Sequence, residues 1–140
     1  VKRVQEELGE EYYIVMKMHP HLDAKHKLSN CDIPTERILP IADMLIADYS
    51  SVIFDYTLYQ KPIVLFVPDY DEFVSTRGLY IDLNEIPGQM VKDGTDLKEA
   101  VLREFIEFNR DEYRAFYEDY MGACDGKATK RIIDEISAKI

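Results

Sequence analysis

Three short apolar runs constrain the fold of this chain most strongly, because each is followed by polar residues or a proline. They cover residues 12–18, 44–47 and 63–67. None alternates strictly between apolar and polar side chains, and such runs are typical of strands buried on both faces in a parallel sheet. Pro20 and Pro68 follow the first and third runs and end regular strand pairing there. The runs therefore predict three buried parallel strands.

Helical patterns separate these runs and continue after the third. Apolar residues at helical spacing predict helices over residues 35–39, 51–59, 95–109, 110–121 and 127–140. Residues 79–82 and 89–91 are also expected to form small edge strands. Strands that alternate with helices and are followed by a helical tail predict an α/β fold, a Rossmann-like three-layer sandwich around a parallel sheet.

Length and charge narrow the class of protein. The 140 residues suit one domain, so we expect residues 1–140 to fold as a unit. The chain opens at Val1 with a pattern typical of the middle of a helix, which predicts a fragment of a longer protein. A formal charge of −10 argues against a nucleic-acid partner. No run of about 18 apolar residues is present, and two distant cysteines fit a reducing compartment such as the cytoplasm.

The ends of the predicted strands mark the candidate site. In open α/β sheets, ligands bind at the carboxyl ends of the strands. This rule selects His19-Pro20, the run from Asp48 to Ser51, and Pro68-Asp69. Because the strands are predicted to be parallel, we expect these three places to lie side by side along one edge of the sheet.

The most informative of these places is the turn that carries Ser50 and Ser51. One of these serines is a natural N-cap, which leaves backbone N–H groups at the positive end of a helix dipole to hold a phosphate. Asp55 follows Ser51 by one helical turn, where its carboxylate can accept hydrogen bonds from ribose hydroxyls. The spacing alone fits equally well a capped helix with a solvated aspartate, so both interpretations stay open.

Two further positions have chemistry that suits a phosphorylated ligand. His19 follows a predicted strand, where an imidazole donates to phosphate or transfers protons near neutral pH. Arg77 precedes Gly78 in a predicted loop, and a guanidinium beside a flexible glycine suits phosphate recognition. The alternatives are a surface histidine and a salt bridge from Arg77 to a nearby acid.

The sequence favours no metal site. The histidines at positions 19, 21 and 26 lack the spacing and the fourth ligand of a zinc centre. Asp69 and Asp71 have the spacing of an Asp-x-Asp metal motif, but they lie in a predicted loop without supporting context. We therefore expect neither a metal nor another cofactor.

Taken together, these motifs resemble one family. Residues 17–20 (Lys-Met-His-Pro), residues 43–51 ending in Asp-Tyr-Ser-Ser, and Phe54-Asp55 are similar to the carboxy-terminal lobe of CDP-glycerol glycerophosphotransferases. The similarity continues through further residues along nearly the whole chain: Lys61-Pro62, Arg77-Gly78-Leu79-Tyr80, Asp82, Gly88, Gly126-Lys127-Ala128 and Arg131. The Asp-Tyr-Ser-Ser block with its Phe-Asp pair is the specific part of this match.

The resemblance implies a fold and an activity. The family has the two-lobed GT-B architecture with the active site between lobes, and it transfers glycerol phosphate from CDP-glycerol to a polyol-phosphate polymer of the teichoic-acid type, releasing CMP. By resemblance, Ser50 and Ser51 contact phosphate, Asp55 contacts ribose, and Arg77 with Gly78 supports the diphosphate. His19 is then the catalytic histidine of this lobe.

The same resemblance implies partners and a location. A second histidine belongs to an amino-terminal lobe that these 140 residues lack, so the fragment alone is expected to bind donor without turnover. The full-length enzyme is expected in the cytoplasm, peripheral at the inner face of the cell membrane. Two alternatives stay open. One is the donor lobe of another GT-B enzyme that uses CDP-ribitol or a sugar nucleotide, and the other is a non-catalytic α/β binding module.

Overall fold

The computed structural model describes residues 2–17 and 31–139, and its centre is a parallel sheet. Three strands, β1 (Leu45–Ala47), β2 (Ile63–Phe66) and β3 (Gln89–Val91), lie in the order β1-β2-β3. Leu45 pairs with Ile63, and Val64 pairs with Gln89, both in parallel register. The structure thus confirms the parallel sheet and the strands expected within residues 44–47, 63–67 and 89–91.

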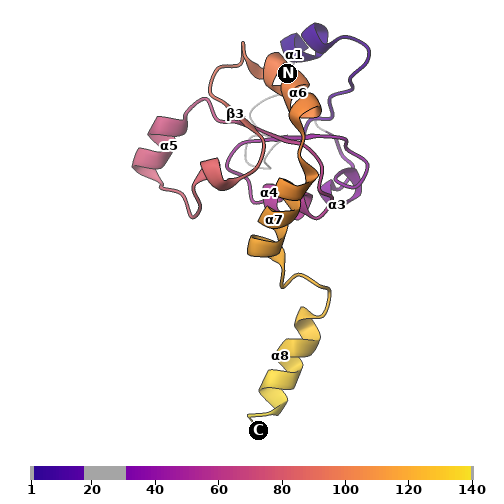
Figure 1. Cartoon of the computed structure of the whole chain (residues 1–140), viewed down its shortest axis with the longest axis vertical. Coiled ribbons are helices and arrows are strands. Elements are labelled where there is room, and N and C mark those ends of the chain that lie inside the picture. Colours follow the sequence, from indigo (N-terminus) through magenta and orange to yellow (C-terminus); the bar gives the residue numbers. More distant parts are fainter. Residues whose placement is uncertain (1, 18–30, 140) are drawn as a thin grey trace.

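Helices cover both faces of the sheet (Figure 1). On one face, α4 (Val52–Thr57) packs against β1 and against α7 (Arg110–Met121). On the other face, α6 (Leu97–Glu107) packs against β2 and β3 and carries α1 (Lys2–Leu8) on its outer side. The predicted three-layer sandwich is therefore present. In the described residues, the other helices are α3 (Thr35–Ile38), α5 (Tyr70–Thr76), the 3-10 helix η1 (Leu83–Glu85) and α8 (Ala128–Ser137).

The central strand β2 supplies side chains to two separate cores. Ile63 and Leu65, with Val67 just after the strand, point into a first core cluster between the sheet and α4 and α7. Val64 points to the opposite face, into a second core cluster with α1 and α6. These four side chains have no measurable exposure to solvent. Burial on both faces explains why the run is apolar without alternation.

Residues 12–17 form no strand, so the prediction of a first strand at 12–18 is wrong for its described part. The Gln5 side chain of α1 replaces a neighbouring strand, because its Nε2 donates to Tyr12 O (2.6 Å) and its Oε1 accepts from Ile14 N (2.9 Å). Tyr12 and Ile14 pack on the second core cluster, whereas Tyr13 is 91% exposed. The segment is therefore an extended strap buried on one side.

Two other expectations also need correction. Residues 79–82 form no strand, and the stretch after Pro68 is the helix α5 instead of a loop. Asp71 and Glu72 lie in the first turn of α5, where their charge is favourable to the helix dipole. Gly78 follows the helix with a φ of 72°, a conformation that glycine adopts without steric cost, and this ends α5.

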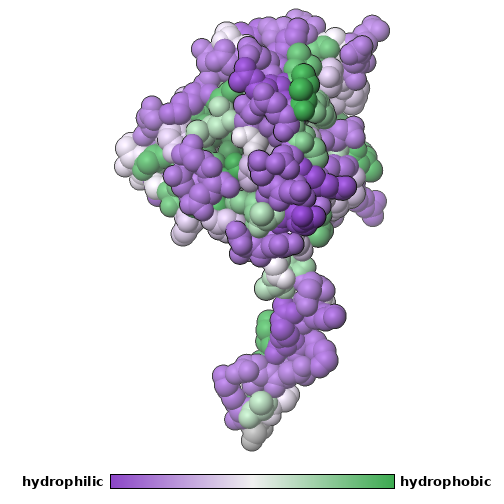
Figure 2. Space-filling model, in the orientation of Figure 1, coloured by the Kyte–Doolittle hydropathy of each residue, from purple (hydrophilic) through white to green (hydrophobic). Residues whose placement is uncertain are grey.

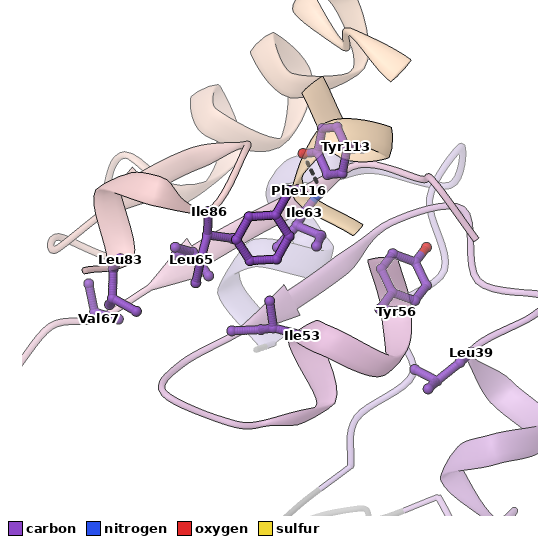
Figure 3. Packing of buried hydrophobic residues seen from close by; sticks show 10 residues of the cluster. All are labelled: Leu39, Ile53, Tyr56, Ile63, Leu65, Val67, Leu83, Ile86, Tyr113 and Phe116. Atoms are coloured by element: carbon purple, nitrogen blue, oxygen red, sulfur yellow. Dashed lines mark hydrogen bonds between the residues drawn. The ribbon is translucent and has the colours of Figure 1, made fainter. Parts of the chain in front are cut away.

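A buried hydrogen-bond network joins the sheet to two helices, and Figure 3 shows its bond between Tyr113 and Ile63. The Tyr113 hydroxyl of α7 accepts from Ile63 N of β2 (2.9 Å) and donates to Glu104 Oε1 of α6 (2.6 Å). Tyr113 is 1% exposed and Glu104 is 3% exposed. Gly88 packs directly against this network. A Cβ at this residue would lie 2.1 Å from Ile63 O and 2.9 Å from the Tyr113 hydroxyl, so a larger residue would clash there. One phenol thus connects β2, α6 and α7.

Replacing Tyr113 with phenylalanine should destabilise the protein far more than the removal of an exposed hydroxyl does. The change leaves the buried Ile63 N–H without an acceptor and removes the donor to Glu104. An unsatisfied buried group costs about 1–3 kcal/mol, so we expect the free energy of unfolding in urea to fall by about that amount. Tyr117→Phe is the matched control on α7, because the Tyr117 hydroxyl makes only a 3.4 Å bond to Cys124 O. Equal losses in both variants would contradict the assigned role.

Glu104 should make the stability depend on pH. Burial raises the pKa of this carboxyl, against the opposing hydrogen bonds from Tyr113 and Gln89. A folded-state pKa above the unfolded value means that the native state binds the proton more tightly. The free energy of unfolding should therefore fall as pH rises from about 4 through the raised pKa. Glu104→Gln keeps an acceptor for Tyr113 but removes the titrating group, so the free energy of unfolding measured in urea should depend less on pH. An unchanged pH dependence in this variant would contradict the role assigned to Glu104.

Candidate functional site

The carboxyl ends of β1 and β2 lie next to each other, as expected for the candidate site. Ala47, the last residue of β1, pairs with Leu65 of β2 in parallel register. The chain leaves β1 through Asp48 to Ser51 and enters α4, and it leaves β2 through Val67 to Asp69 and enters α5. The two turns therefore meet at one edge of the sheet, and this is the edge that the ligand rule for α/β sheets selects.

Tyr49 holds the two turns together. Its hydroxyl donates to Asp69 Oδ1 (3.0 Å), and its ring stacks on Phe73 of α5 with centroids 3.7 Å apart and planes 10° apart. Burial and the hydrogen bond to Asp69 raise the pKa of the Tyr49 hydroxyl above its ordinary value, so it remains a donor at neutral pH. A single side chain from the Asp-Tyr-Ser-Ser motif thus joins the β1 turn to α5.

Arg77 belongs to the same aromatic stack. Its guanidinium carbon lies 5.5 Å from the Phe73 ring centroid, within the range of a cation–π interaction. Within the described residues, Arg77 takes part in no ion pair, so the alternative of a salt bridge to a neighbouring acid is not observed there. Arg77 and Gly78 are exposed, and the five guanidinium donors are available to a ligand.

The stack forms one wall of a depression of about 720 Å³. The depression is lined by the β1 turn, the end of β2 and one side of α5: Asp48, Tyr49, Phe66, Pro68, Asp69, Glu72, Phe73, Thr76 and Arg77. Three of these nine residues are carboxylates and one is a cation. The sequence predicted Arg77 and both turns, but it did not predict the aromatic wall, because that wall requires α5.

Ser50, Ser51 and Asp55 are not part of this lining, although the two serines directly follow Tyr49, which is. The helix α4 begins at Val52, with Ser51 as its N-cap residue, one position later than a helix predicted over 51–59. The Ser51 side chain makes no capping hydrogen bond, whereas Ser50 Oγ accepts from Val52 N at 3.4 Å. All three residues are exposed to solvent. The Ser51 hydroxyl and the Asp55 carboxylate are thus not used by the helix itself.

Other motif residues have structural roles. Lys61 Nζ donates to Pro40 O (2.9 Å) and Ala42 O (2.7 Å), which fixes the turn that leads into β1. Lys17 Nζ donates to Cys31 O (2.6 Å) and Ile33 O (3.1 Å). Both lysines therefore hold backbone carbonyls in the folded domain. His19 lies outside the described residues.

Over residues 2–17 and 31–139, His, Cys, Asp and Glu form no group of three or more that would suit a metal ion. In the same residues, every helix is too short or too polar to cross a bilayer.

Two curated relatives match nearly the whole chain. A teichoic acid poly(ribitol-phosphate) polymerase from Bacillus spizizenii is 31% identical over 145 residues, covering 96% of this chain and 23% of that protein. A teichoic acid glycerol-phosphate transferase from Staphylococcus aureus is 29% identical, covering 97% of this chain and 38% of that protein. The chain therefore spans less than two fifths of the length of these relatives.

The fold is similar to that of a solved enzyme, the wall teichoic acid polymerase TagF. The match has a TM-score of 0.77 at 26% identity and covers 99% of this chain and 37% of the polymerase. A variant of TagF soaked with CDPG matches with a TM-score of 0.74 at 27% identity, covering 99% of this chain and 38% of that chain. The similarity supports the predicted fold class, a lobe of the GT-B type.

A sequence profile of one family matches residues 1–138. The profile extends over both strand-end turns and α5, which line the depression, and over the other described motif residues. This match, together with the teichoic-acid relatives and the polymerase fold, identifies the family of the chain. The chain belongs to the CDP-Glycerol:Poly(glycerophosphate) glycerophosphotransferase family.

Proposed function

We propose that residues 1–140 form the donor-binding lobe of a longer transferase that moves glycerol phosphate from CDP-glycerol to a polyol-phosphate polymer and releases CMP. The observation that carries the proposal is the position of the family motif. Its Asp-Tyr-Ser-Ser block lies at the carboxyl end of β1, at the depression that is also lined by Arg77, the residue after α5. The match of the family profile to residues 1–138 supports the reaction class.

The charges around the depression suggest how a donor would be oriented. Asp48, Asp69 and Glu72 disfavour phosphate in their immediate vicinity, but carboxylates accept hydrogen bonds from hydroxyl groups. The diphosphate is therefore assigned to the side of Ser50 and Ser51, whose hydroxyls are exposed. In this arrangement the hydroxyl groups of the polyol face the acidic lining.

The remaining residues complete the proposed mechanism. Asp55 is exposed one turn along α4 from Ser51, where it would accept from the ribose hydroxyls. Arg77 and the backbone N–H groups before Val52 would stabilise the negative charge that develops on the oxygen of departing CMP. His19 is assigned to proton transfer beside the diphosphate, on the basis of its motif alone. This scheme uses neither a metal nor a cofactor.

A second donor is supported by the relatives. The Bacillus spizizenii protein with 31% identity is a poly(ribitol-phosphate) polymerase, whereas the Staphylococcus aureus protein with 29% identity is a glycerol-phosphate transferase. The two identities are too close to separate the donors. CDP-ribitol is therefore the alternative donor, and it would use the same cytidine, ribose and diphosphate contacts.

The proposal includes parts outside these residues. An amino-terminal lobe of the same polypeptide would supply the other wall of the active-site cleft and the acceptor site. By the family resemblance, the longer enzyme is assigned to the inner face of the cell membrane as a peripheral protein. In this proposal the 140 residues alone bind donor but do not complete a turnover.

Cytidine nucleotides should bind this chain more tightly than other nucleotides. Isothermal titration with CDP, UDP and ADP should give the highest affinity for CDP, because the family reaction uses a cytidine diphosphate donor. Affinity should be weak, since one wall of the cleft is absent and the ligand still loses its freedom of motion. Equal affinity for all three nucleotides would contradict a cytidine site and would favour a general anion site.

Ser51→Ala and Asp55→Ala should weaken binding in different ways. Loss of the Ser51 hydroxyl should reduce CDP affinity and leave cytidine affinity unchanged, because the hydroxyl is assigned to phosphate. Loss of the Asp55 carboxylate should reduce both affinities by a similar factor, because it is assigned to ribose. A hydrogen bond to a charged group is worth about 1.5–3 kcal/mol, so each loss should be about tenfold or more.

Thermal melting of the same variants separates binding from folding. The Ser51 side chain makes no capping bond, so Ser51→Ala should leave the melting temperature nearly unchanged. Ser75→Ala is the matched control, because Ser75 is an exposed serine of the neighbouring helix α5 whose hydroxyl donates to Glu72 O. A lower melting temperature for Ser51→Ala with unaltered CDP affinity would show that this serine only builds the helix.

A further inference from the structure

The helix α5 lies at one side of the body of the molecule (Figure 1). None of its residues is buried, and only Tyr70 and Phe73 are partly covered. Figure 2, in the same orientation, shows apolar residues among polar ones on this side of the molecule. Because α5 buries so little surface, its place depends on few contacts. The position of Arg77, the residue that follows α5, depends on the same contacts.

Tyr49 connects α5 to the core of the protein. The Tyr49 side chain packs against the first core cluster and also stacks on Phe73 of α5. Its hydroxyl donates to a carboxylate oxygen of Asp69, the residue before the helix. Asp69 and Phe73 are one helical turn apart, so Tyr49 contacts the same face of α5 at two points. Two such contacts fix both the place and the rotation of the helix.

Phe73 extends this constraint to Arg77. The two residues are also one helical turn apart, on the same face of α5. Arg77 N donates to Phe73 O (2.9 Å), which fixes the backbone of the arginine relative to the ring. The guanidinium carbon lies 5.5 Å from the ring centroid, a cation–π distance. The Arg77 side chain thus takes its direction from a ring that Tyr49 holds.

The surroundings of Arg77 make this direction important. Asp48, Asp69 and Glu72 line the same depression. Opposite charges a few ångströms apart attract one another even near a protein surface, so a guanidinium released from the stack would be drawn to one of these carboxylates. A guanidinium paired with a carboxylate is less able to stabilise a departing phosphate oxygen. The stack therefore selects one of several positions that are attractive to the arginine.

We propose that Tyr49 is a positioning residue of the transferase, which acts through Phe73 to hold the Arg77 guanidinium where negative charge develops on the departing CMP. This inference rests on the proposed function, which assigns that charge to Arg77. The Asp-Tyr-Ser-Ser motif then has two tasks, because its serines are assigned to the donor phosphate and its tyrosine fixes the cation of a neighbouring helix. An interaction made only in the transition state lowers kcat and leaves KM nearly unchanged when it is removed.

Kinetics of the longer transferase polypeptide test this inference. Removal of a group that stabilises developing charge costs about a hundredfold in kcat, and this loss is expected for Arg77→Ala. Tyr49→Leu should lower kcat about tenfold, the upper range for an aromatic pair, and Tyr49→Phe should retain most of the activity because the ring remains. In the Arg77→Ala background, Tyr49→Leu should have almost no further effect on kcat, because a residue that acts through Arg77 then has nothing to position.

Tyr59→Leu is the matched control. Tyr59 is also partly buried, packs on the first core cluster and pairs with another aromatic ring, that of Tyr56, but it does not line the depression. With all assays below the melting temperature of the least stable variant, this change should leave kcat unchanged. Independent losses of kcat from Tyr49→Leu and Arg77→Ala, or equal losses from Tyr49→Leu and Tyr59→Leu, would overturn the proposal.

A second measurement, on the 140-residue chain, does not require transfer. Nuclear Overhauser contacts between the Arg77 side chain and the Phe73 ring should be present in the wild type and in Tyr59→Leu, and absent in Tyr49→Leu. Contacts that persist in Tyr49→Leu would overturn the proposal even if kcat falls. If the longer wild-type polypeptide transfers neither glycerol phosphate from CDP-glycerol nor ribitol phosphate from CDP-ribitol, the proposed function fails, and these contacts still decide whether Tyr49 holds Arg77.

Discussion

Burial of β2 on both faces is the constraint on which the rest of the structure depends. Alternate residues of this strand enter different cores, with Ile63 and Leu65 on the α4 and α7 side and Val64 on the α1 and α6 side. Hydrophobic side chains on both faces leave the backbone groups of the strand no access to water, so each must find a partner inside the protein. β1 and β3 supply most of these partners. The Tyr113 hydroxyl supplies the acceptor for Ile63 N, at the start of the strand.

The candidate site follows from this arrangement. Because β1 is held in parallel register against β2, the turns after both strands emerge at one edge, and Tyr49 bridges them through Asp69 and Phe73. At the opposite end of β1, the turn before the strand is also fixed, because Ala42 O accepts from both Lys61 Nζ (2.7 Å) and the Tyr56 hydroxyl (2.9 Å). Rigid strands and fixed turns place Ser51 at the start of α4 without a capping bond from its own side chain.

The family motifs thus contain two kinds of residue. Lys17, Lys61 and Arg131 use their charged groups on backbone carbonyls, and Arg131 also pairs with Asp125. Ser51, Asp55 and Arg77 are exposed, and the fold does not require their polar groups. This division explains why charge alone is a poor guide to function in such a motif. A charged motif residue whose hydrogen bonds already hold the fold together is a weaker candidate for ligand binding than one whose groups are free.

The sequence by itself determined the parallel α/β class, the strands near residues 45–47, 63–66 and 89–91, and the position of Asp48 to Ser51 at a strand end. These features depend on local apolar runs and turn residues, which are visible in any short window. Only the tertiary structure decided that residues 12–17 form a strap, because the Gln5 side chain competes with a strand for Tyr12 O and Ile14 N. It also decided that α5 brings Phe73 and Arg77 to Tyr49. The first outcome rests on hydrogen bonds from one polar side chain, and the second on a contact between Tyr49 and Phe73, which are distant in sequence; apolar periodicity encodes neither.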